Sequence, residues 1–422
     1  MALDVVFKHP AALRKYQRNP FFVLLEGYCQ WLIDQRYART AICGKIFHLR
    51  YLTKYLIRRG VTKPAGINWE HLQRFLDTWL PKFCGPRGGR GGQAKVIGFS
   101  VTSFCRYLTV SGIIPPRPTV MLPYQSLLKE HIRWLYEHRH LNARTVEKRV
   151  RYVGSLLDWL GANDTPPYKL AALTPHRLQD FLLQRGGSPG SAKAVEVACT
   201  LRVFLAFCFG RGYLDRNLSA AIPCFRRYKL STVPRGIDDE TAQRLLDSID
   251  RQKPVGLRDY AIIQLLYTYG VRAEQVSTLR LEDIQWSAGR IRFPPIKCGK
   301  TVIDPLTGDA GDSLLAYLRH GRAASLHPEV FLIDRAPWTP ITRALVPWIV
   351  CNRIRKAGLA VPVPGARAFR HRFATKMLAE GHRLKSIADM LGHRNIASAS
   401  VYAKVDFPML EQAALEWPGE ES

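Results

Sequence analysis

The second half of the chain carries a set of cations and one tyrosine whose types suit chemistry on a phosphodiester. A phosphodiester in its transition state spreads negative charge over its non-bridging oxygens, and planar guanidinium groups hold such oxygens in bidentate fashion. Each well-placed donor stabilises that state by roughly 3–4 kcal/mol. The candidate residues are Arg272, Lys297 or Lys300, Arg367, Arg370, His371, His393 and Tyr402.

A tyrosine among these cations can act as a nucleophile without a metal. Ionising a free tyrosine, whose pKa is about 10, costs about 4 kcal/mol at pH 7, and two or three neighbouring arginines supply much of that. A lysine on a mobile hairpin can protonate the leaving 5′-oxygen. The product is a phosphotyrosyl ester that retains the energy of the broken bond, so the strand can be rejoined without ATP.

Apolar spacing predicts the elements that hold these groups. Three apolar residues recur at four-residue intervals between positions 369 and 377, which predicts a helix with Arg370 at the flank of its buried face. A second helix ends at Gly392, so we expect His393 on the following turn with both ring nitrogens free. Apolar residues at 291, 293 and 302 flank the segment from Lys297 to Lys300 and predict a β-hairpin.

The remainder of this half is predicted to be mainly helical. Helices are expected at about 239–249 and 257–269, then a short one through Leu279, and again after about position 340. The fold class is therefore mainly α, with a small sheet beside the candidate site.

The first half contains an internal repeat. Residues 28–114 and 131–214 each begin with an amphipathic helix that carries a tryptophan, Trp31 or Trp134, and each ends with an aromatic helix. A glycine, Gly112 or Gly212, follows at the position of a left-handed helix cap. The repeat predicts two small all-helical modules of similar fold.

We expect the chain to divide at changes in composition. The predicted parts are a first helical module at 1–118, a second at 119–224, a polar and basic linker at 225–236, and a catalytic domain at 237–422.

Composition limits the class of protein. The formal net charge is +28 and 47% of residues are hydrophobic, which excludes a wholly disordered chain and favours nucleic acid as the partner. No apolar run reaches the length of a membrane span and no signal peptide is recognisable. The nine cysteines include no C-x-x-C pair, so we expect no disulfide framework, zinc site or other cofactor, and a reducing, cytoplasmic location.

The most specific element is the pair Arg370-His371, followed by Leu-Gly-His at 391–393 and by Tyr402 nine residues after His393. With the segments around Arg272 and the predicted hairpin, it resembles the tyrosine recombinase (phage integrase) family. The resemblance covers residues 237–405 closely. Residues 125–220 look like the helical core-DNA-binding domain of that family, and residues 20–115 look like a second copy of it.

The resemblance implies a role for each matching residue. Arg272 and Arg370 are the arginines that hold the phosphate, His393 donates a hydrogen bond to the transition state, and Tyr402 is the nucleophile. Lys297 is the hairpin lysine that acts as the acid, preferred over Lys300 because it aligns better with the family's pattern.

The chain departs from the family at two positions. The family usually has His or Lys three residues before the second arginine, where this chain has Arg367, which stays protonated and cannot act as an ordinary general base. The acidic residue expected three positions after Arg272 is Gln275, with Glu274 one place earlier. We expect Glu274, Gln275 and His371 to contact the catalytic residues and hold them in position without taking part in the reaction.

The resemblance implies a site-specific DNA recombinase of a mobile element, which cuts and rejoins strands through a 3′-phosphotyrosyl intermediate without metal or ATP. The expected partners are double-stranded DNA with specific recombination sites and other recombinases of the same element, with no membrane. An amphipathic helix at 408–418 would dock on a neighbouring copy, so that four copies assemble on two DNA duplexes. In the cell the protein would associate with the nucleoid.

Three alternatives remain open at this stage. Residues 374–391, with Gly381 between two predicted helices, resemble the helix-turn-helix of a non-enzymatic DNA-binding regulator. A type IB topoisomerase-like enzyme would use the same chemistry without exchanging partners. A subunit whose catalysis has decayed is the third.

Overall fold

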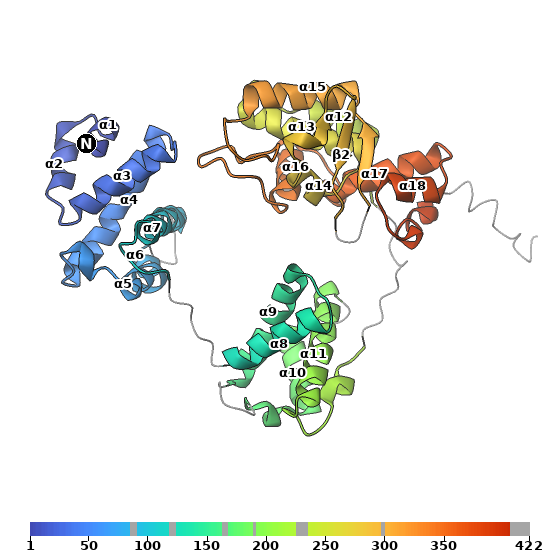
Figure 1. Ribbon diagram of the computed structural model, residues 1–422, viewed down its shortest axis with the longest axis horizontal. Helices are drawn as coiled ribbons and strands as arrows, with labels where there is room; N and C mark the ends of the chain where they lie inside the picture. The colour runs from blue at the N-terminus through green and yellow to red at the C-terminus, as the bar shows by residue number, and fades with distance from the viewer. Residues whose placement is uncertain are drawn as a thin grey trace, which may run out of the picture. The chain divides into compact units, whose positions relative to one another are not determined.

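The computed structural model describes residues 1–84, 91–117, 124–162, 168–188, 191–224, 235–296 and 300–405. Each of these ranges contains helices, and the one sheet of the described residues lies in the C-terminal part (Figure 1). Residues 117–229 form a compact unit of their own. None of the described helices is both long enough and apolar enough to cross a membrane.

The N-terminal residues form helices around one hydrophobic core, which includes Tyr28, Leu49 and Phe104. The bounds are α1 Ala2–Val6, α2 Pro10–Gln17, α3 Phe22–Asp34, α4 Arg39–Arg58, η1 Pro64–Gly66, α5 Trp69–Arg74, η2 Phe75–Trp79, α6 Leu80–Cys84 and α7 Gly91–Val110.

The second group of helices has its own core, which includes Leu127, Leu157 and Phe204. The bounds are α8 Gln125–Glu137, α9 Ala143–Leu160, η3 Leu170–Ala172, α10 Pro175–Arg185, α11 Ala192–Gly210 and η4 Leu218–Ala221. Side-chain oxygens of Asn142 and Ser191 accept backbone N–H groups at the starts of α9 and α11, so both helices begin at favourable N-caps.

Matching positions of the predicted repeat occupy matching places in the two groups of helices. The Trp31 ring lies 6.1 Å from the Tyr107 ring in the first, and the Trp134 ring lies 5.5 Å from the Phe207 ring in the second. The predicted helix-ending glycine adopts a left-handed conformation in both, with φ of 68° and 73°. These contacts support the internal repeat.

The C-terminal part is helical with a small antiparallel sheet of order β1-β2-β3. The predicted hairpin is confirmed, because Phe293 of β2 pairs with Val302 of β3. The sequence did not indicate β1, which has only two residues, or α15. The bounds are α12 Asp239–Asp247, α13 Pro254–Tyr269, α14 Ala273–Ser277, η5 Leu281–Asp283, β1 Ile284–Gln285, β2 Arg290–Phe293, β3 Val302–Pro305, α15 Gly308–Ala316, η6 Tyr317–Gly321, α16 Leu345–Lys356, α17 Ala366–Ala379, α18 Leu384–Met390, η7 Ile396–Ser398 and η8 Tyr402–Val405.

Helix α13 lies at the centre of this part and is buried along most of its length. It contacts α15 on one side and α17 on another, and the main core includes Phe293, Phe331 and Phe369. A second, smaller cluster joins α17, α18 and η8, and includes Met377, Leu391 and Tyr402. The last turn of the described chain is thereby held against the helix that carries Arg370.

The predicted helix that carries Arg370 exists as α17, but its buried face differs from the expectation. Phe369 and Met377 are buried, whereas Phe373 is only half-buried. Arg370 is itself buried, whereas the spacing predicted it at the flank of the buried face. The predicted docking helix at 408–418 and most of the predicted linker at 225–236 lie outside the described residues.

Candidate active site

A cavity of about 680 Å³ lies where α14 begins, where α17 begins and where the turns after α18 lead to η8. It brings together predicted residues that are far apart in the sequence. Lys297 lies outside the described residues, but Ile296, which precedes it, lines the cavity. The predicted residues on its wall are Arg272, Glu274, Arg367, Arg370, His371, His393 and Tyr402.

Arg370 is held by three hydrogen bonds. Its Nη1 donates to the carbonyl of Gly270 at 3.0 Å, and its Nη2 donates to the carbonyl of Leu391 at 2.8 Å and to Nε2 of His393 at 2.8 Å. Burial and the neighbouring Arg272 lower the pKa of Arg370 to about 9, so the group remains a cation at neutral pH. The guanidinium is a fixed charge at the back of the cavity.

Gly270 supplies that carbonyl from a backbone conformation that favours glycine. It ends α13 with φ of 58°, and a Cβ there would lie 2.7 Å from the Phe373 side chain. The left-handed turn and the close approach of α17 both require a residue without a side chain.

His393 lies on the turn after α18, as predicted, but only one of its ring nitrogens is free. Because Arg370 donates to Nε2, the geometry assigns the ring proton to Nδ1. Burial, then Arg370 and Arg272, lower the pKa of His393 to about 4, so the ring is neutral at neutral pH. The buried Nδ1 has no hydrogen-bond partner among the described residues, which leaves a donor for a substrate oxygen.

Arg272 stands at the start of α14 and points at the same carbonyl as Arg370. Its Nη1 donates to the Leu391 carbonyl at 3.4 Å, so the two guanidinium groups converge. Burial lowers the pKa of Arg272. Its backbone N–H donates to Gln275 at 3.0 Å, and the Gln275 amide donates to the Pro294 carbonyl at 3.3 Å. The glutamine thus orients the backbone at Arg272.

Tyr402 is almost fully buried, with 2% of its surface exposed. Its ring meets the His371 ring edge-on, with centroids 5.7 Å apart. Burial raises the pKa of Tyr402, whereas the positive charges of Arg370, Arg272 and Arg367 oppose that effect. The phenol is therefore protonated at neutral pH, and attack on a phosphate requires loss of that proton.

Arg367 and His371 occupy the same helix as Arg370. Arg367 is exposed, one turn before Arg370, and lines the cavity. His371 is half-buried, and burial, Arg367 and Arg370 together lower its pKa. Arg367 thus lies on the same wall as Arg370, and its role in the reaction stays a prediction.

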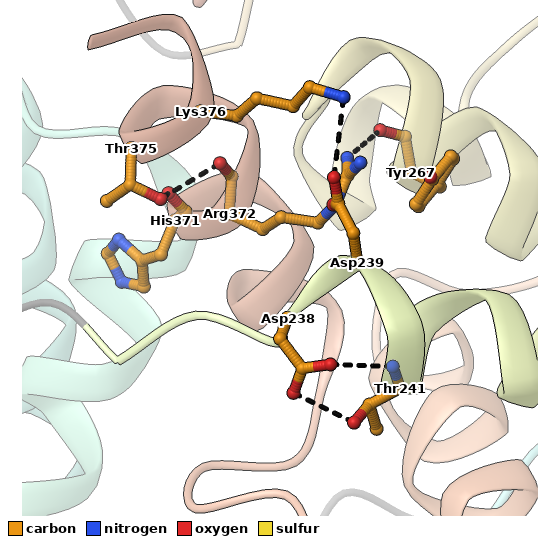
Figure 2. A network of polar contacts seen from close by, with 8 residues as sticks. All are labelled: Asp238, Asp239, Thr241, Tyr267, His371, Arg372, Thr375 and Lys376. Carbon is orange, nitrogen blue, oxygen red and sulfur yellow. Dashed lines mark hydrogen bonds and ion pairs between the residues drawn. The ribbon is translucent and has the colours of Figure 1, made fainter. Parts of the chain in front are cut away.

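A polar network behind α17 fixes this helix and was not predicted from the sequence (Figure 2). The buried Arg372 donates to Asp239 at the start of α12 and, at 3.1 Å, to the Tyr267 carbonyl of α13. Its guanidinium also lies 3.7 Å from the centre of the Tyr267 ring, and Lys376 pairs with Asp239 at 3.4 Å. The network joins α17 to α12 and α13.

Substitution of Asp239 is expected to loosen this network and to change the pH dependence of stability. Burial raises the pKa of Asp239, but Arg372 and Lys376 more than offset this, so it lies below its usual 3.8. A depressed carboxyl pKa stabilises the fold above about pH 4, and that contribution is lost as the pH falls through the folded-state pKa. Asp239→Asn is expected to lower the free energy of unfolding by about 1–2 kcal/mol at about pH 7.

The measurement is urea unfolding of the variant and the wild-type protein between about pH 2.5 and 7. The difference is expected to shrink towards the acid end. Asp247→Asn is the control, because Asp247 is an exposed carboxyl of the same helix and contacts Gln243. An equal loss of stability at every pH would contradict the assignment.

No group of three or more His, Cys, Asp or Glu suited to a metal ion occurs in the ranges that the structure describes. The donors that line the cavity are instead mainly guanidinium groups and imidazoles, which suit a bound oxyanion.

The amino-acid sequence is similar to those of known proteins. The profile of the phage integrase family matches residues 235–408. The putative integrase/recombinase y4rA of Sinorhizobium fredii is 30% identical over 414 residues, which make up 97% of each chain. The tyrosine recombinase XerD of Listeria monocytogenes is 26% identical over 285 residues, 66% of this chain and 94% of XerD.

Two solved structures share the fold at low sequence identity. The XerH recombinase bound to palindromic difH superimposes with a TM-score of 0.51 and 17% identity, over 82% of this chain and 96% of XerH. A lambda integrase dimer bound to a COC′ core site gives a TM-score of 0.51 and 15% identity, over 79% and 91%. Because the match to y4rA extends along nearly the whole length of both proteins and the family profile spans the cavity, this chain belongs to the phage integrase family of tyrosine recombinases.

Proposed function

We propose that this protein is a site-specific DNA recombinase that uses Tyr402 to cut and rejoin DNA strands. The observation that carries the proposal is the convergence of Arg272, Arg370, His393 and Tyr402 on one cavity. Two fixed cations and a neutral imidazole N–H donor there match the charge that develops on a phosphodiester under attack.

The chemical step forms one P–O bond and breaks another. The Tyr402 oxygen attacks phosphorus and gives its proton to water. The bond between phosphorus and the 5′-oxygen of the next nucleotide breaks, and that oxygen leaves and takes up a proton. Arg272 and Arg370 bind the non-bridging oxygens, and the Nδ1–H of His393 donates to one of them. We assign protonation of the 5′-oxygen to Lys297, which follows the cavity residue Ile296 in the chain.

The 3′-phosphotyrosyl ester then accepts a 5′-hydroxyl from another strand by the reverse reaction. One bond to phosphorus is exchanged for another, so no ATP is needed. The raised pKa of buried Tyr402 limits ionisation before a phosphate arrives. A phosphate bound by the arginines lies beside the phenol, so that the Tyr402 oxygen can attack its phosphorus.

We further propose that the two helical groups are DNA-binding modules at residues 1–118 and 119–224, joined by the linker at 225–236 to the catalytic domain at 237–422. The formal net charge of +28 and the fold shared with the DNA-bound XerH and lambda integrase support double-stranded DNA as the partner. The likeness to the putative integrase/recombinase y4rA supports a recombinase. We propose in addition that it belongs to a mobile element and acts as a tetramer joined through residues 408–418.

A nicked duplex tests the reaction directly. The duplex is selected by the protein from a randomised pool and carries a nick just beyond the cleavage position, so the short 5′-hydroxyl fragment diffuses away and the covalent adduct accumulates. Peptide mapping is expected to place the DNA on Tyr402. Relaxation of any supercoiled plasmid, with no preferred site and no strand exchange, would instead support a topoisomerase.

Removal of residues 1–116 tests the first module. These residues have a separate core, so the remaining chain keeps the core of the second group of helices and both hydrophobic clusters of the C-terminal part. The slope of log K against log salt concentration is expected to become shallower by about 0.9 for each DNA phosphate that the first module neutralises. Equilibrium titration of the selected duplex at several salt concentrations gives the slope. An unchanged slope would contradict DNA binding by this module.

A further inference from the structure

One ion pair on the cavity wall is not explained by the reaction described above. Arg343 precedes α16, and its Nη1 lies 3.0 Å from Oε2 of Glu274 in the first turn of α14. Both residues line the cavity, and their side chains are 43% and 33% exposed. The pair is thus open to a ligand in the cavity.

The carboxylate of Glu274 does not orient the catalytic arginine beside it. The backbone N–H of Arg272 donates a hydrogen bond to the Gln275 side chain, and the Arg272 guanidinium donates one to the Leu391 carbonyl. Within the part of the chain that the structure describes, Arg343 is the one residue that bonds to the Glu274 carboxylate. Glu274 therefore serves Arg343 rather than the residues that contact the reacting phosphate.

The cavity holds more cations than a single phosphate needs. Its described wall carries five arginines and one carboxylate, that of Glu274. The volume of about 680 Å³ falls within the range of roughly 300–1,000 Å³ of pockets that enclose ligands larger than a phosphate. Since each nucleotide of a strand brings one further phosphate, a strand that places one phosphate at Arg370 brings its neighbours to the rest of the wall.

A guanidinium group binds carboxylate and phosphate oxygens with the same planar geometry. The Glu274 carboxylate consequently marks a place beside Arg343 where an anion is bound. Partly exposed pairs of this kind contribute little to stability, so an incoming phosphate can replace the carboxylate at small cost.

We propose that Arg343 binds a DNA phosphate adjacent to the scissile one, and that Glu274 neutralises Arg343 until that phosphate replaces it. The inference rests on the proposed function, because it takes the ligand of the cavity to be a DNA strand. Arg343 is a positioning residue in this arrangement, since it holds the strand and does not touch the reacting atoms.

The two partners of the pair then have opposite effects on DNA binding. Arg343→Gln removes the phosphate ligand and is expected to weaken binding about tenfold, with a salt slope shallower by about 0.9. Glu274→Gln removes the competing carboxylate and is expected to strengthen binding about threefold. A merely structural ion pair predicts the same direction for both variants, because either substitution breaks it.

The pair Arg280–Glu282 provides a matched control in the same part of the chain. These side chains lie 3.4 Å apart, are 53% and 63% exposed, and do not line the cavity. Arg280→Gln and Glu282→Gln are expected to bind the selected duplex as the wild-type protein does.

A scan of neutral methylphosphonates across the cleavage region identifies the phosphate. The tenfold loss in Arg343→Gln is expected to disappear when one phosphate next to the scissile one is neutral, because wild-type protein and variant then lack the same interaction. A loss that persists at every modified position, or weaker binding by both Arg343→Gln and Glu274→Gln, would overturn the inference.

The same samples separate this inference from the proposed function. Wild-type protein that forms no adduct on the nicked duplex would contradict the recombinase reaction, whatever Arg343→Gln does to binding. A normal adduct on Tyr402, together with wild-type affinity in Arg343→Gln, would overturn the role of Arg343 alone.

Discussion

Tyr402→Phe is expected to abolish the covalent DNA adduct while leaving DNA affinity nearly unchanged. The substitution removes one oxygen from a side chain that is almost fully buried, and the ring keeps its edge-on contact with His371. The arginines that we propose as phosphate ligands are unaffected, so DNA binding is expected to persist without a nucleophile. The amount of covalent adduct is expected to fall below the detection limit of the assay.

Gel separation of the adduct on the nicked duplex and equilibrium titration of the intact duplex give the two readouts. Tyr267→Phe is the control, because Tyr267 lies on α13, packs its ring against Arg372 of α17 and does not line the cavity. That variant is expected to form the adduct normally. An adduct in Tyr402→Phe would show that a different residue attacks the phosphate.

Arg367→Ala is expected to slow cleavage by roughly 10²–10³-fold, the usual effect of removing one donor to a transition state. Arg367 lines the cavity one turn before Arg370, and its charge opposes the rise in the pKa of Tyr402. If the position mainly requires a cation that donates hydrogen bonds, Arg367→His stays within about tenfold of the wild-type rate, a difference of about 1.4 kcal/mol or less.

Single-turnover cleavage of the nicked duplex by both variants measures this effect. Arg280→Ala is the control, because that arginine is exposed and does not line the cavity. Wild-type rates in Arg367→Ala would place Arg367 outside the reaction. A large loss in Arg367→His would show that the guanidinium group itself is required, because an imidazole cannot reproduce its planar fork of donors.

Local patterns were sufficient to predict most of the helical elements of the site. The four-residue spacing around Arg370 and the glycine before His393 predicted the helix and the turn that α17 and Gly392 form. The segments flanking Lys297 predicted the hairpin. Strand β1 was missed because two residues are too few to show a period. Burial of Arg370 was missed because periodicity describes apolar residues rather than a cation held by hydrogen bonds.

The sequence by itself determined the family, the helical repeat and the positions of Arg272, Arg370, His393 and Tyr402, because these depend on residue type and spacing along the chain. Only the tertiary structure decided how their side chains are held. Arg370 reaches His393 across 23 positions, Arg343 reaches Glu274 across 69, and Arg372 reaches Asp239 across 133. Such pairs form when packed helices bring distant segments together, and burial there shifts the pKa values of Arg370, His393 and Tyr402 in ways that spacing along the chain does not show.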